Sequence, residues 1–272
     1  MNNELINNKY LPLRSKKLFV LDMDGTFYLG DRILEGSLDF VKRIRESDRR
    51  FMFFTNNASK TPEYYMGKLK KMGCDINRED IVTSGDVTIE YLLKKYPGGK
   101  VYLVGTPLLE ESFRKAGINL VSLVSEESAD VVVVSFDLTL TYEKVSRACD
   151  FIRKGAVFIA THMDLNCPTE QGPIPDCGSI CAMITASTGI KPKYLGKPFN
   201  ETIGAILRIS GCRTDEMAII GDRLYTDIAM GYKNGVTSIL VLTGETRMED
   251  VEKSEIKPDF IFPSLGSLAK VL

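Results

Sequence analysis

The sequence alternates short, continuous apolar runs with longer amphipathic segments, and this alternation restricts the fold more than any other feature. Strands covered on both faces show continuous hydrophobicity, whereas helices packed on a sheet carry apolar residues at helical spacing. The pattern therefore predicts an α/β protein with parallel strands. Strands are expected at residues 18–22, 51–55, 101–105, 130–137, 156–161, 217–222, 238–244 and 259–262. Helices are expected at residues 38–46, 63–72, 142–154 and 201–210.

The length and composition of the chain allow one large domain or two smaller ones. It has 272 residues, of which 44% are apolar, so it can bury a sizeable core. The segment 83–191 contains three of the expected strands and is long enough to form an α/β domain of its own. We therefore expect a core built from residues 1–82 and 192–272, with a second α/β domain inserted between them.

The charge balance gives no support for a protein that binds nucleic acid or a membrane surface. Lys and Arg total 35 against 36 Asp and Glu, and no long basic run is present. The polar N-terminus, residues 1–17, lacks the apolar region of a signal peptide, and no apolar run approaches eighteen residues. The six cysteines form no Cys-x-x-Cys pair, and Cys177 and Cys181 have the spacing of one helix face. These features predict a soluble, cytoplasmic protein.

Two carboxylates, Asp22 and Asp24, follow the first apolar run directly. Side chains at i and i+2 of a strand share a face, so two negative charges are expected close together at the end of a hydrophobic element. One interpretation is a simple turn, because Asp24-Gly25 is a strong turn signal. The other is a cation site with a reactive carboxylate, in which the cation offsets the repulsion.

Polar groups also end two other expected strands, at Thr55-Asn56-Asn57 and at Gly221-Asp222. In open parallel sheets, ligands bind beyond the carboxyl ends of the strands, so groups far apart in sequence can meet there. Each group alone is explained as a cap of the following helix, but a set that shares one chemistry favours a site. Lys197, between Gly196 and Pro198, is a further candidate, although a solvated loop is the usual place of a lysine.

Four motifs resemble those of the haloacid-dehalogenase superfamily of phosphohydrolases: D-x-D-G-T, a strand-end Thr, a downstream Lys and G-D-R-x3-D. The residue sequences of these motifs are similar to those of the NagD-type and para-nitrophenylphosphatase-like subgroup. They read LDMDGTFYLG, FFTNNAS, GKPFNETI and GDRLYTDIAMG. The resemblance runs from Leu18 over nearly all of the chain. It implies a Rossmann-like parallel-sheet core, in which the segment 83–191 is a large α/β cap, of type C2, that closes over the substrate.

The resemblance also implies roles for the carboxylates. Asp22 would be the nucleophile that takes the phosphoryl group as an aspartyl-phosphate, and Asp24 the acid and then the base. Mg²⁺, or Mn²⁺, would be held by Asp22, the backbone carbonyl of Asp24 and Asp222, with Asp227 supporting the site. These oxygen ligands suit Mg²⁺, whose charge neutralises the approach of a carboxylate to a phosphate.

The remaining motif residues are implied to bind or support the phosphate group. Thr55 and Asn56 would hold phosphate oxygens, and Lys197 would bridge the phosphate and the nucleophile. Gly25 allows a tight bend, so that the amides after Asp22 face the phosphate. Thr26 is expected to steady this turn rather than contact the substrate.

The function implied is Mg²⁺-dependent hydrolysis of a small phosphomonoester. Asp24 favours a phosphatase, because a leaving alkoxide benefits from a proton, and related phosphoryl-transfer ATPases carry Thr at this position. One alternative is a phosphate-accepting signalling module without rapid turnover, but such receivers are about half as long and lack the insertion. A catalytically inactive binding protein is the other alternative, and the intact motifs argue against it.

The substrate is left open among sugar phosphates, nucleoside monophosphates, phosphoglycolate and pyridoxal phosphate. The segment 160–180 holds the single histidine of the chain, His162, with Asp164 and Asn166 close behind it. The resemblance places this segment over the site, which makes the three residues candidates for substrate binding. A lone histidine is more often structural, so both interpretations stay open. Caps of this type often mediate dimers in the family, which suggests a homodimer through the cap.

Overall fold

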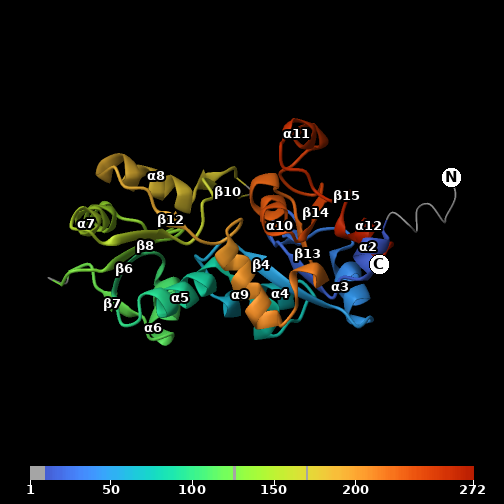
Figure 1. Cartoon of the computed structure of the whole chain (residues 1–272), viewed down its shortest axis with the longest axis horizontal. Helices are drawn as coiled ribbons and strands as arrows, with labels where there is room; N and C mark the ends of the chain where they lie inside the picture. Colours follow the sequence, from blue (N-terminus) through green and yellow to red (C-terminus); the bar gives the residue numbers. More distant parts are fainter. Residues whose placement is uncertain (1–9, 125–126, 170) are drawn as a thin grey trace. The chain divides into compact units, whose positions relative to one another are not determined.

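The computed structural model describes residues 10–124, 127–169 and 171–272, which fold as an α/β protein (Figure 1). The chain forms two compact units. Unit 1 comprises Met1–Phe54, Met66–Val82 and Ile203–Leu272, and unit 2 comprises Thr55–Tyr65 and Thr83–Thr202. Each unit has its own sheet, and the parallel pairing of the expected strands confirms the α/β prediction.

The sheet of unit 1 has six strands in the order β15-β14-β13-β1-β4-β5. Their bounds are β1 Leu18–Leu21, β4 Arg50–Thr55, β5 Ile81–Thr83, β13 Met217–Gly221, β14 Thr237–Val241 and β15 Phe260–Phe262. Strand β1 is central and pairs in parallel with both β13 and β4. All four residues of β1 are buried, as expected for a strand covered on both faces. The carboxyl ends of β1 and β13 therefore lie side by side.

Helices and short elements complete unit 1. The helices are α2 Leu11–Arg14, α3 Ser37–Arg45, α10 Ala229–Asn234, α11 Met248–Lys253 and α12 Leu265–Ala269. Two further helices, α4 Pro62–Lys71 and α9 Asn200–Ser210, each contain a boundary between the units. The short elements are the antiparallel pair β2 Tyr28–Leu29 and β3 Arg32–Ile33, the 3₁₀ turns Arg78–Asp80 and Thr214–Glu216, and the π-helical turn Leu224–Ile228. Helix α3 buries Phe40, whose ring meets Phe19 of β1 edge-on at 5.8 Å.

The sheet of unit 2 has five parallel strands in the order β12-β9-β8-β6-β7. Their bounds are β6 Lys100–Val104, β7 Asn119–Val121, β8 Val131–Val134, β9 Val157–Ala160 and β12 Lys193–Tyr194. The helices are α5 Ser84–Lys95, α6 Pro107–Lys115, α7 Tyr142–Arg153 and α8 Cys177–Thr188, and β10 Asn166–Cys167 pairs antiparallel with β11 Ile174–Pro175.

Alternating side chains of this sheet pack on two layers of helices, α7 and α8 on one face and α5 and α6 on the other (Figure 1). In β8, Val132 and Val134 belong to the cluster with α7 and α8, whereas Val131 and Val133 belong to the other. This two-sided burial explains the continuous apolar runs. Cys181 and Cys177 lie in the first cluster, as the spacing predicted.

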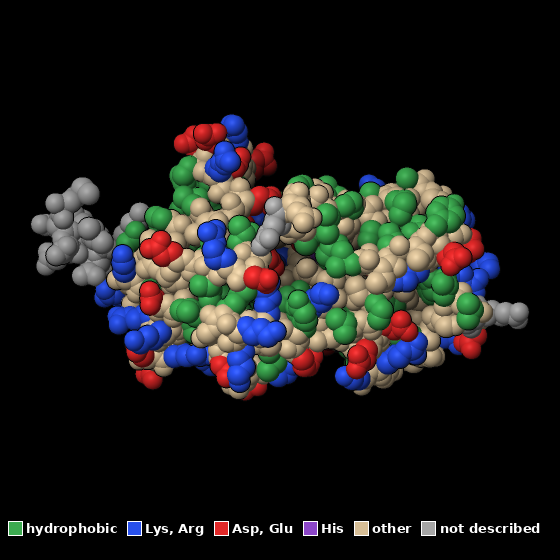
Figure 2. Space-filling view, turned by 180° about the vertical axis from the view of Figure 1, so that it is seen from behind, with side chains coloured by type: hydrophobic (Ala, Val, Ile, Leu, Met, Phe, Trp, Pro, Cys, Tyr) green, Lys and Arg blue, Asp and Glu red, His purple; other side chains and the backbone are tan. Residues whose placement is uncertain are grey.

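The structural units and the predicted domains use different boundaries. Residues 55–65 and 192–202 cluster with unit 2, whereas the sequence interpretation assigned them to the core. The division at residues 83 and 191, and the role of the insertion as a cap, stay predictions. Within the described residues, every helix is too short or too polar to cross a membrane. Figure 2 shows basic and acidic side chains interspersed over the visible face, as a net charge of −1 suggests.

Candidate functional site

The two carboxylates that follow β1 point away from the core. Met23, between them, is fully buried, whereas Asp22 and Asp24 are both half-buried. This is the arrangement expected when residues i and i+2 share a face. The backbone N–H of Asp22 donates to the carbonyl of Ile220 at 2.9 Å, which ties the end of β1 to β13. The hydroxyl of Tyr28 donates to Asp24 Oδ2 at 3.3 Å.

The turn after Asp24 requires a glycine for two reasons. Gly25 has a φ of 86°, which lies in the left-handed region, and a Cβ there would lie 2.6 Å from Asp222 Oδ2. The N–H of Gly25 donates to the carbonyl of Tyr28 at 2.8 Å, and that of Thr26 donates to Met23 at 3.3 Å. These two amides serve the turn itself, and the prediction that amides after Asp22 face a phosphate stays a prediction.

Asp222 follows β13 and is held from two sides. Its Oδ1 accepts a hydrogen bond from Thr26 Oγ1 at 3.3 Å, and its Oδ2 accepts one from the N–H of Glu245 at 2.7 Å. Only 2% of the residue is exposed, and hydrogen bonds of this kind offset the cost of burying a carboxylate. Thr26 is thus placed to orient Asp222.

The loop after β14, residues 243–246, is the part of this site that the sequence interpretation missed. Thr243 Oγ1 donates to the carbonyl of Gly25 at 2.7 Å, and the N–H of Thr246 donates to the carbonyl of Asp222 at 3.2 Å. A Cβ on Gly244 would overlap the carboxylate of Asp222. The available signal was the polar Thr-Gly-Glu that follows an apolar run, as at the other strand ends.

Asp227 lies in the π-helical turn after Asp222, and only 1% of it is exposed. Its Oδ2 accepts hydrogen bonds from the N–H of Arg223 and from Thr226 Oγ1, both at 3.3 Å. A Cβ on Gly221 would overlap its carboxylate, so the chain approaches this side chain closely. These contacts fix Asp227 directly behind the end of β13.

Unit 1 therefore brings together the three carboxylates Asp22, Asp222 and Asp227. Each offers one oxygen, and these oxygens all lie within 4.8 Å of one another. Like charges this close are stable only with a compensating cation or protons. An oxygen-only donor set without His or Cys is the kind that Mg²⁺ prefers, so the residues present fit this ion. The sequence interpretation placed Asp227 behind the metal ligands; one of its carboxylate oxygens lies within 4.8 Å of those of Asp22 and Asp222, and its supporting role stays a prediction.

The strand-end threonine is buried in a turn of its own. Thr55 is the last residue of β4 and is 4% exposed. Its Oγ1 accepts a hydrogen bond from the N–H of Asn57 at 3.1 Å, and Asn57 Oδ1 in turn accepts from the N–H of Ser59 at 3.0 Å. This chain of bonds holds the polypeptide after β4 in a fixed path.

Asn56, Asp164 and Lys197 meet in unit 2, although 141 residues separate the first from the last. Asn56 Nδ2 donates to Asp164 Oδ2 at 3.1 Å and to the carbonyl of Lys197 at 3.3 Å. Asn56 Oδ1 accepts from the N–H of Lys197 at 2.8 Å. All three residues are at least 95% buried. The structure thus joins two of the predicted phosphate-binding residues to one residue of the segment 160–180.

His162 is fully buried, and both of its ring nitrogens have partners. Nδ1 lies 2.9 Å from Thr161 Oγ1, and Nε2 lies 2.9 Å from Asp176 Oδ1. Asp176 also caps α8 by accepting from the N–H of Cys177. Burial alone would lower the pKa of His162, but the charge of Asp176 and its hydrogen bond, with Cys177 and Asp164 nearby, raise it to about 10. The contacts of His162 are those of a structural ion pair.

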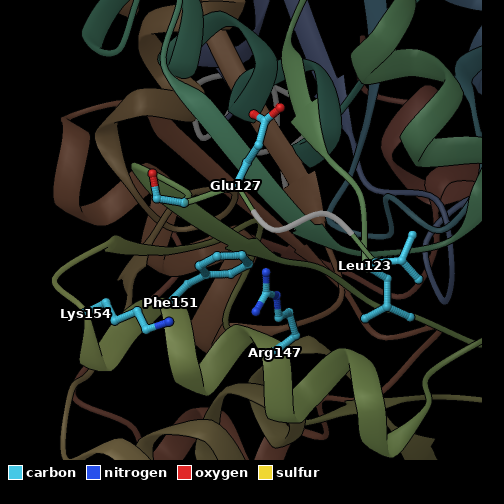
Figure 3. Close-up of a pocket in the computed structure, with 7 residues that line it drawn as sticks. Leu123, Glu127, Arg147, Phe151 and Lys154 are labelled. Atoms are coloured by element: carbon cyan, nitrogen blue, oxygen red, sulfur yellow. The ribbon is translucent and has the colours of Figure 1, made fainter.

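The third residue of the segment 160–180 has different surroundings. Asn166 begins β10 and is exposed, so it is free of the buried network around His162. A pocket of about 490 Å³ lies elsewhere in unit 2, beside α7, and Leu123, Glu127, Arg147, Phe151 and Lys154 line it (Figure 3). None of the residues predicted to bind substrate lines this pocket.

Comparisons with known proteins agree with the motifs. The family model of haloacid dehalogenase-like hydrolases matches residues 19–119, and a HAD-hydrolase-like model matches residues 194–268. An acid sugar phosphatase of Staphylococcus aureus is 34% identical over 254 residues, which are 93% of this chain and 97% of the relative.

Two solved structures are similar over nearly the whole chain. The 4-nitrophenylphosphatase of Thermotoga maritima has 49% identity and a TM-score of 0.90, with 95% of this chain and 98% of that chain covered. The glycerol phosphate phosphatase of Mycobacterium tuberculosis, in complex with magnesium, has 30% identity and a TM-score of 0.87, with 94% and 78% covered.

Proposed function

Because this chain belongs to the haloacid dehalogenase-like hydrolases and is a NagD-like phosphatase, we propose that it hydrolyses small phosphomonoesters with the carboxylates that follow β1 and β13. The observation that carries this proposal is the convergence of Asp22, Asp222 and Asp227, whose oxygens lie within 4.8 Å of one another. A carboxylate that attacks a phosphate dianion needs its charge neutralised and its position fixed, and this cluster supports both.

Asp22 is the proposed nucleophile. One of its oxygens attacks phosphorus and forms an aspartyl-phosphate, while the bond from phosphorus to the leaving oxygen breaks. Asp24, on the same face of the chain, gives its proton to the leaving oxygen. Water then attacks the phosphorus, Asp24 takes up the proton of that water, and the bond to Asp22 breaks to release phosphate. The tie between the N–H of Asp22 and the carbonyl of Ile220 keeps the nucleophile in place.

Asp22 and Asp222, with the carbonyl of Asp24, are the proposed ligands of Mg²⁺, and Asp227 lies beside them. Bound there, Mg²⁺ would offset the negative charge of the carboxylates and of the phosphate. Thr26 and the N–H of Glu245 each hold one oxygen of Asp222, which fixes the direction of its lone pairs. This pre-orientation by neighbouring donors is typical of ligating carboxylates.

Thr55 and Lys197 are proposed to act on the phosphate group itself. A hydroxyl donates a hydrogen bond to a phosphate oxygen. An ammonium group stabilises the negative charge on the phosphate oxygens in the transition state. Both residues are at least 96% buried, and a buried position is unusual for lysine unless it is paired. Their hydrogen-bonded surroundings support this assignment, because a fixed backbone limits the freedom of each side chain.

The substrate class follows from the relatives. Their names describe phosphatases of sugar phosphate, 4-nitrophenyl phosphate and glycerol phosphate, all small monoesters. We propose that this chain accepts the same class, with sugar phosphates as the natural group. The exposed Asn166 in unit 2 is a candidate contact for the part of the substrate that differs among these esters.

The test is a phosphate-release screen over sugar phosphates, nucleoside monophosphates, phosphoglycolate, pyridoxal phosphate, glycerol phosphate and 4-nitrophenyl phosphate. Wild-type protein in Mg²⁺ should turn over at least one sugar phosphate many times, and Asp22→Asn should not. A single burst of one phosphate per chain, without turnover, would instead support the phosphate-accepting signalling module.

A further inference from the structure

The nitrogen and the oxygen of the Asn56 carboxamide both form hydrogen bonds to protein groups. Its Oδ1 accepts the N–H of Lys197, and its Nδ2 donates both to the carbonyl of Lys197 and to Asp164 Oδ2. This pattern also fixes which end of the Asn56 amide is oxygen and which is nitrogen. The N–H of Lys197 needs an acceptor, and the carboxylate of Asp164 needs a donor. Two hydrogen bonds to one backbone unit are a paired, directional contact, similar to a rung between two strands.

The backbone on both sides of this contact is held as well. Ser84 Oγ donates to the carbonyl of Asn56 from the first turn of α5. Before Lys197, Gly196 has a φ of 63°, and a Cβ there would lie 2.8 Å from Asn56 Oδ1 and 2.7 Å from the carbonyl of Thr161. The turn that carries Lys197 therefore packs directly against the Asn56 amide, with no room for a side chain.

Asp164 fixes the far end of the amide. Its Oδ2 accepts from Asn56 Nδ2 at 3.1 Å, and its backbone carbonyl accepts the N–H of Gly178 at 2.8 Å, in the first turn of α8. Asp164 is 5% exposed. The backbone of Asp164 is thus anchored to the first turn of α8, and its carboxylate presents an acceptor to Asn56.

We propose that Asn56 is a positioning residue for Lys197, held in place by Asp164, and that its carboxamide does not bind the phosphate. This inference rests on the proposed role of Lys197 in the hydrolysis. A lysine side chain has four rotatable bonds, so the direction of its ammonium group depends on how rigidly its backbone is held. The Asn56 amide supplies that rigidity from both the N–H and the carbonyl of Lys197.

The first experiment exchanges the donor and the acceptor between positions 56 and 164. Asn56→Asp keeps the shape and the acceptor for the N–H of Lys197, but it sets a carboxylate against Asp164. We expect kcat to fall by about tenfold or more, the usual scale for a misplaced catalytic group. The double variant Asn56→Asp/Asp164→Asn restores a donor–acceptor pair between the two positions, while the donor to the Lys197 carbonyl stays lost. The kcat of the double variant should therefore recover in part, to at least about threefold above that of Asn56→Asp.

This rescue separates positioning from phosphate binding. If residue 56 contacts the phosphate, a carboxylate there repels the anion whatever stands at position 164, so the double variant would be no better than Asn56→Asp and the proposal would be overturned. Asn57→Asp is the matched control, because it adds the same charge to the adjacent residue while keeping the acceptor for Ser59. It should lose less kcat than Asn56→Asp, and an equal loss would count against the proposal. Thermal unfolding of every variant shows that the comparison is made on folded protein.

A double-mutant cycle provides a second test, for the case in which Asn56→Asp does not fold. It combines Asn56→Ala with Lys197→Ala, on the best ester of the screen. For a positioning residue, Asn56→Ala should lower kcat in the wild-type background and have almost no further effect once the Lys197 ammonium is gone. Additive losses would mean that Asn56 acts independently of Lys197, which contradicts the proposal.

Failure of the proposed function and failure of the positioning role of Asn56 give different results. A wild-type protein without turnover, or a Lys197→Ala variant as active as wild type, would overturn the proposed function and this inference together. An inactive Lys197→Ala variant, combined with no rescue in the double variant and additive losses, would leave the proposed function standing and overturn the role of Asn56 alone.

Discussion

Gly244 lies so close to Asp222 that a Cβ at position 244 would overlap the carboxylate, while the N–H of the next residue, Glu245, donates to Asp222 Oδ2 at 2.7 Å. The absence of a side chain is therefore what allows the loop after β14 to reach the carboxylate with its backbone. Thr243 Oγ1, from the same loop, holds the carbonyl of Gly25 at 2.7 Å. One short loop thus orients both a proposed metal ligand and the turn after the proposed nucleophile.

Gly244→Ala should lower activity much more than stability, because the new methyl group displaces Asp222 or the loop. A shift of about 1 Å at a catalytic group lowers kcat by on the order of 100-fold. We therefore expect the kcat of Gly244→Ala to be lower than that of wild type by about 10- to 100-fold. Gly67→Ala is the control: Gly67 is exposed within α4, with no atom near an added Cβ. It should keep full activity and gain about 0.5–1 kcal/mol in the free energy of unfolding. Equal kcat for the two variants would refute the proposed role of the loop.

Asp22→Asn should lower kcat by about 10³-fold or more, because the amide keeps the shape of the carboxylate but cannot attack phosphorus. The assay is phosphate release from the best ester of the screen, with thermal unfolding to confirm that the variant is folded. If the variant keeps more than about a tenth of wild-type activity, the loss is smaller than the usual loss of one positioned acid or base. Such a result would rule out Asp22 as the nucleophile.

Removal of divalent cations should abolish activity, and Mg²⁺ should restore it. Asp222→Asn should require a much higher Mg²⁺ concentration for half-maximal activity and should bind Mg²⁺ more weakly in calorimetry, since a charged oxygen ligand is lost. The calorimetric titration is made without substrate, so it reports on the site independently of turnover. Full activity in thoroughly chelated protein would contradict the proposed metal site.

The ion pair of His162 and Asp176 should make the stability of the protein depend on pH. Burial alone would lower the pKa of His162, but Asp176 raises it to about 10, above the ordinary value of 6.5. Since the folded pKa is the higher one, the contribution of His162 is complete below about pH 6.5 and is lost as the pH rises toward 10. The free energy lost on His162→Gln should therefore shrink over this range.

The measurement needs a background without a second titrating group. Burial alone would raise the pKa of Cys177, but its hydrogen bond with Cys181 and the charge of His162 lower it to about 7, which gives the opposite dependence on pH. Urea unfolding from pH 6 to 10 should thus compare Cys177→Ala with Cys177→Ala/His162→Gln. A difference between the two that stays constant with pH would show that His162 is not charged in the folded protein.

Asn166→Ala should change the preference among esters without changing the requirement for Mg²⁺. Because the phosphate group is the same in every substrate, discrimination depends on residues that contact the leaving portion. A lost hydrogen bond to substrate costs about 1–3 kcal/mol in kcat/KM for the best natural ester, with a smaller loss for 4-nitrophenyl phosphate. Equal losses on both esters would mean that Asn166 does not select the substrate.

Local sequence was sufficient for the α/β class and for most strands. The runs that became β1 and β8 are apolar throughout because both of their faces are covered, and that requirement acts on neighbouring residues alone. The same local logic placed Asp22 and Asp24 on one face, on either side of the buried Met23. The short edge strands β5, β7 and β12 were not predicted, because none of them has more than two consecutive apolar residues. The edge strand β15 is equally short but apolar throughout, and it was predicted.

Only the tertiary structure decided which polar groups meet. Asn56 is 108 residues from Asp164 and 141 from Lys197, and nothing in its local sequence distinguishes a phosphate contact from a hydrogen bond to a distant backbone. Likewise, the sequence placed Gly244 at the end of an expected strand, whereas the structure places it in the loop after β14. Because β14 pairs with β13, this loop meets Asp222, and a side chain at position 244 would overlap the carboxylate. The sequence by itself determined the elements and the types of chemical group, because periodicity and strand ends are local; the partners of each group depend on the packing of segments far apart in the chain.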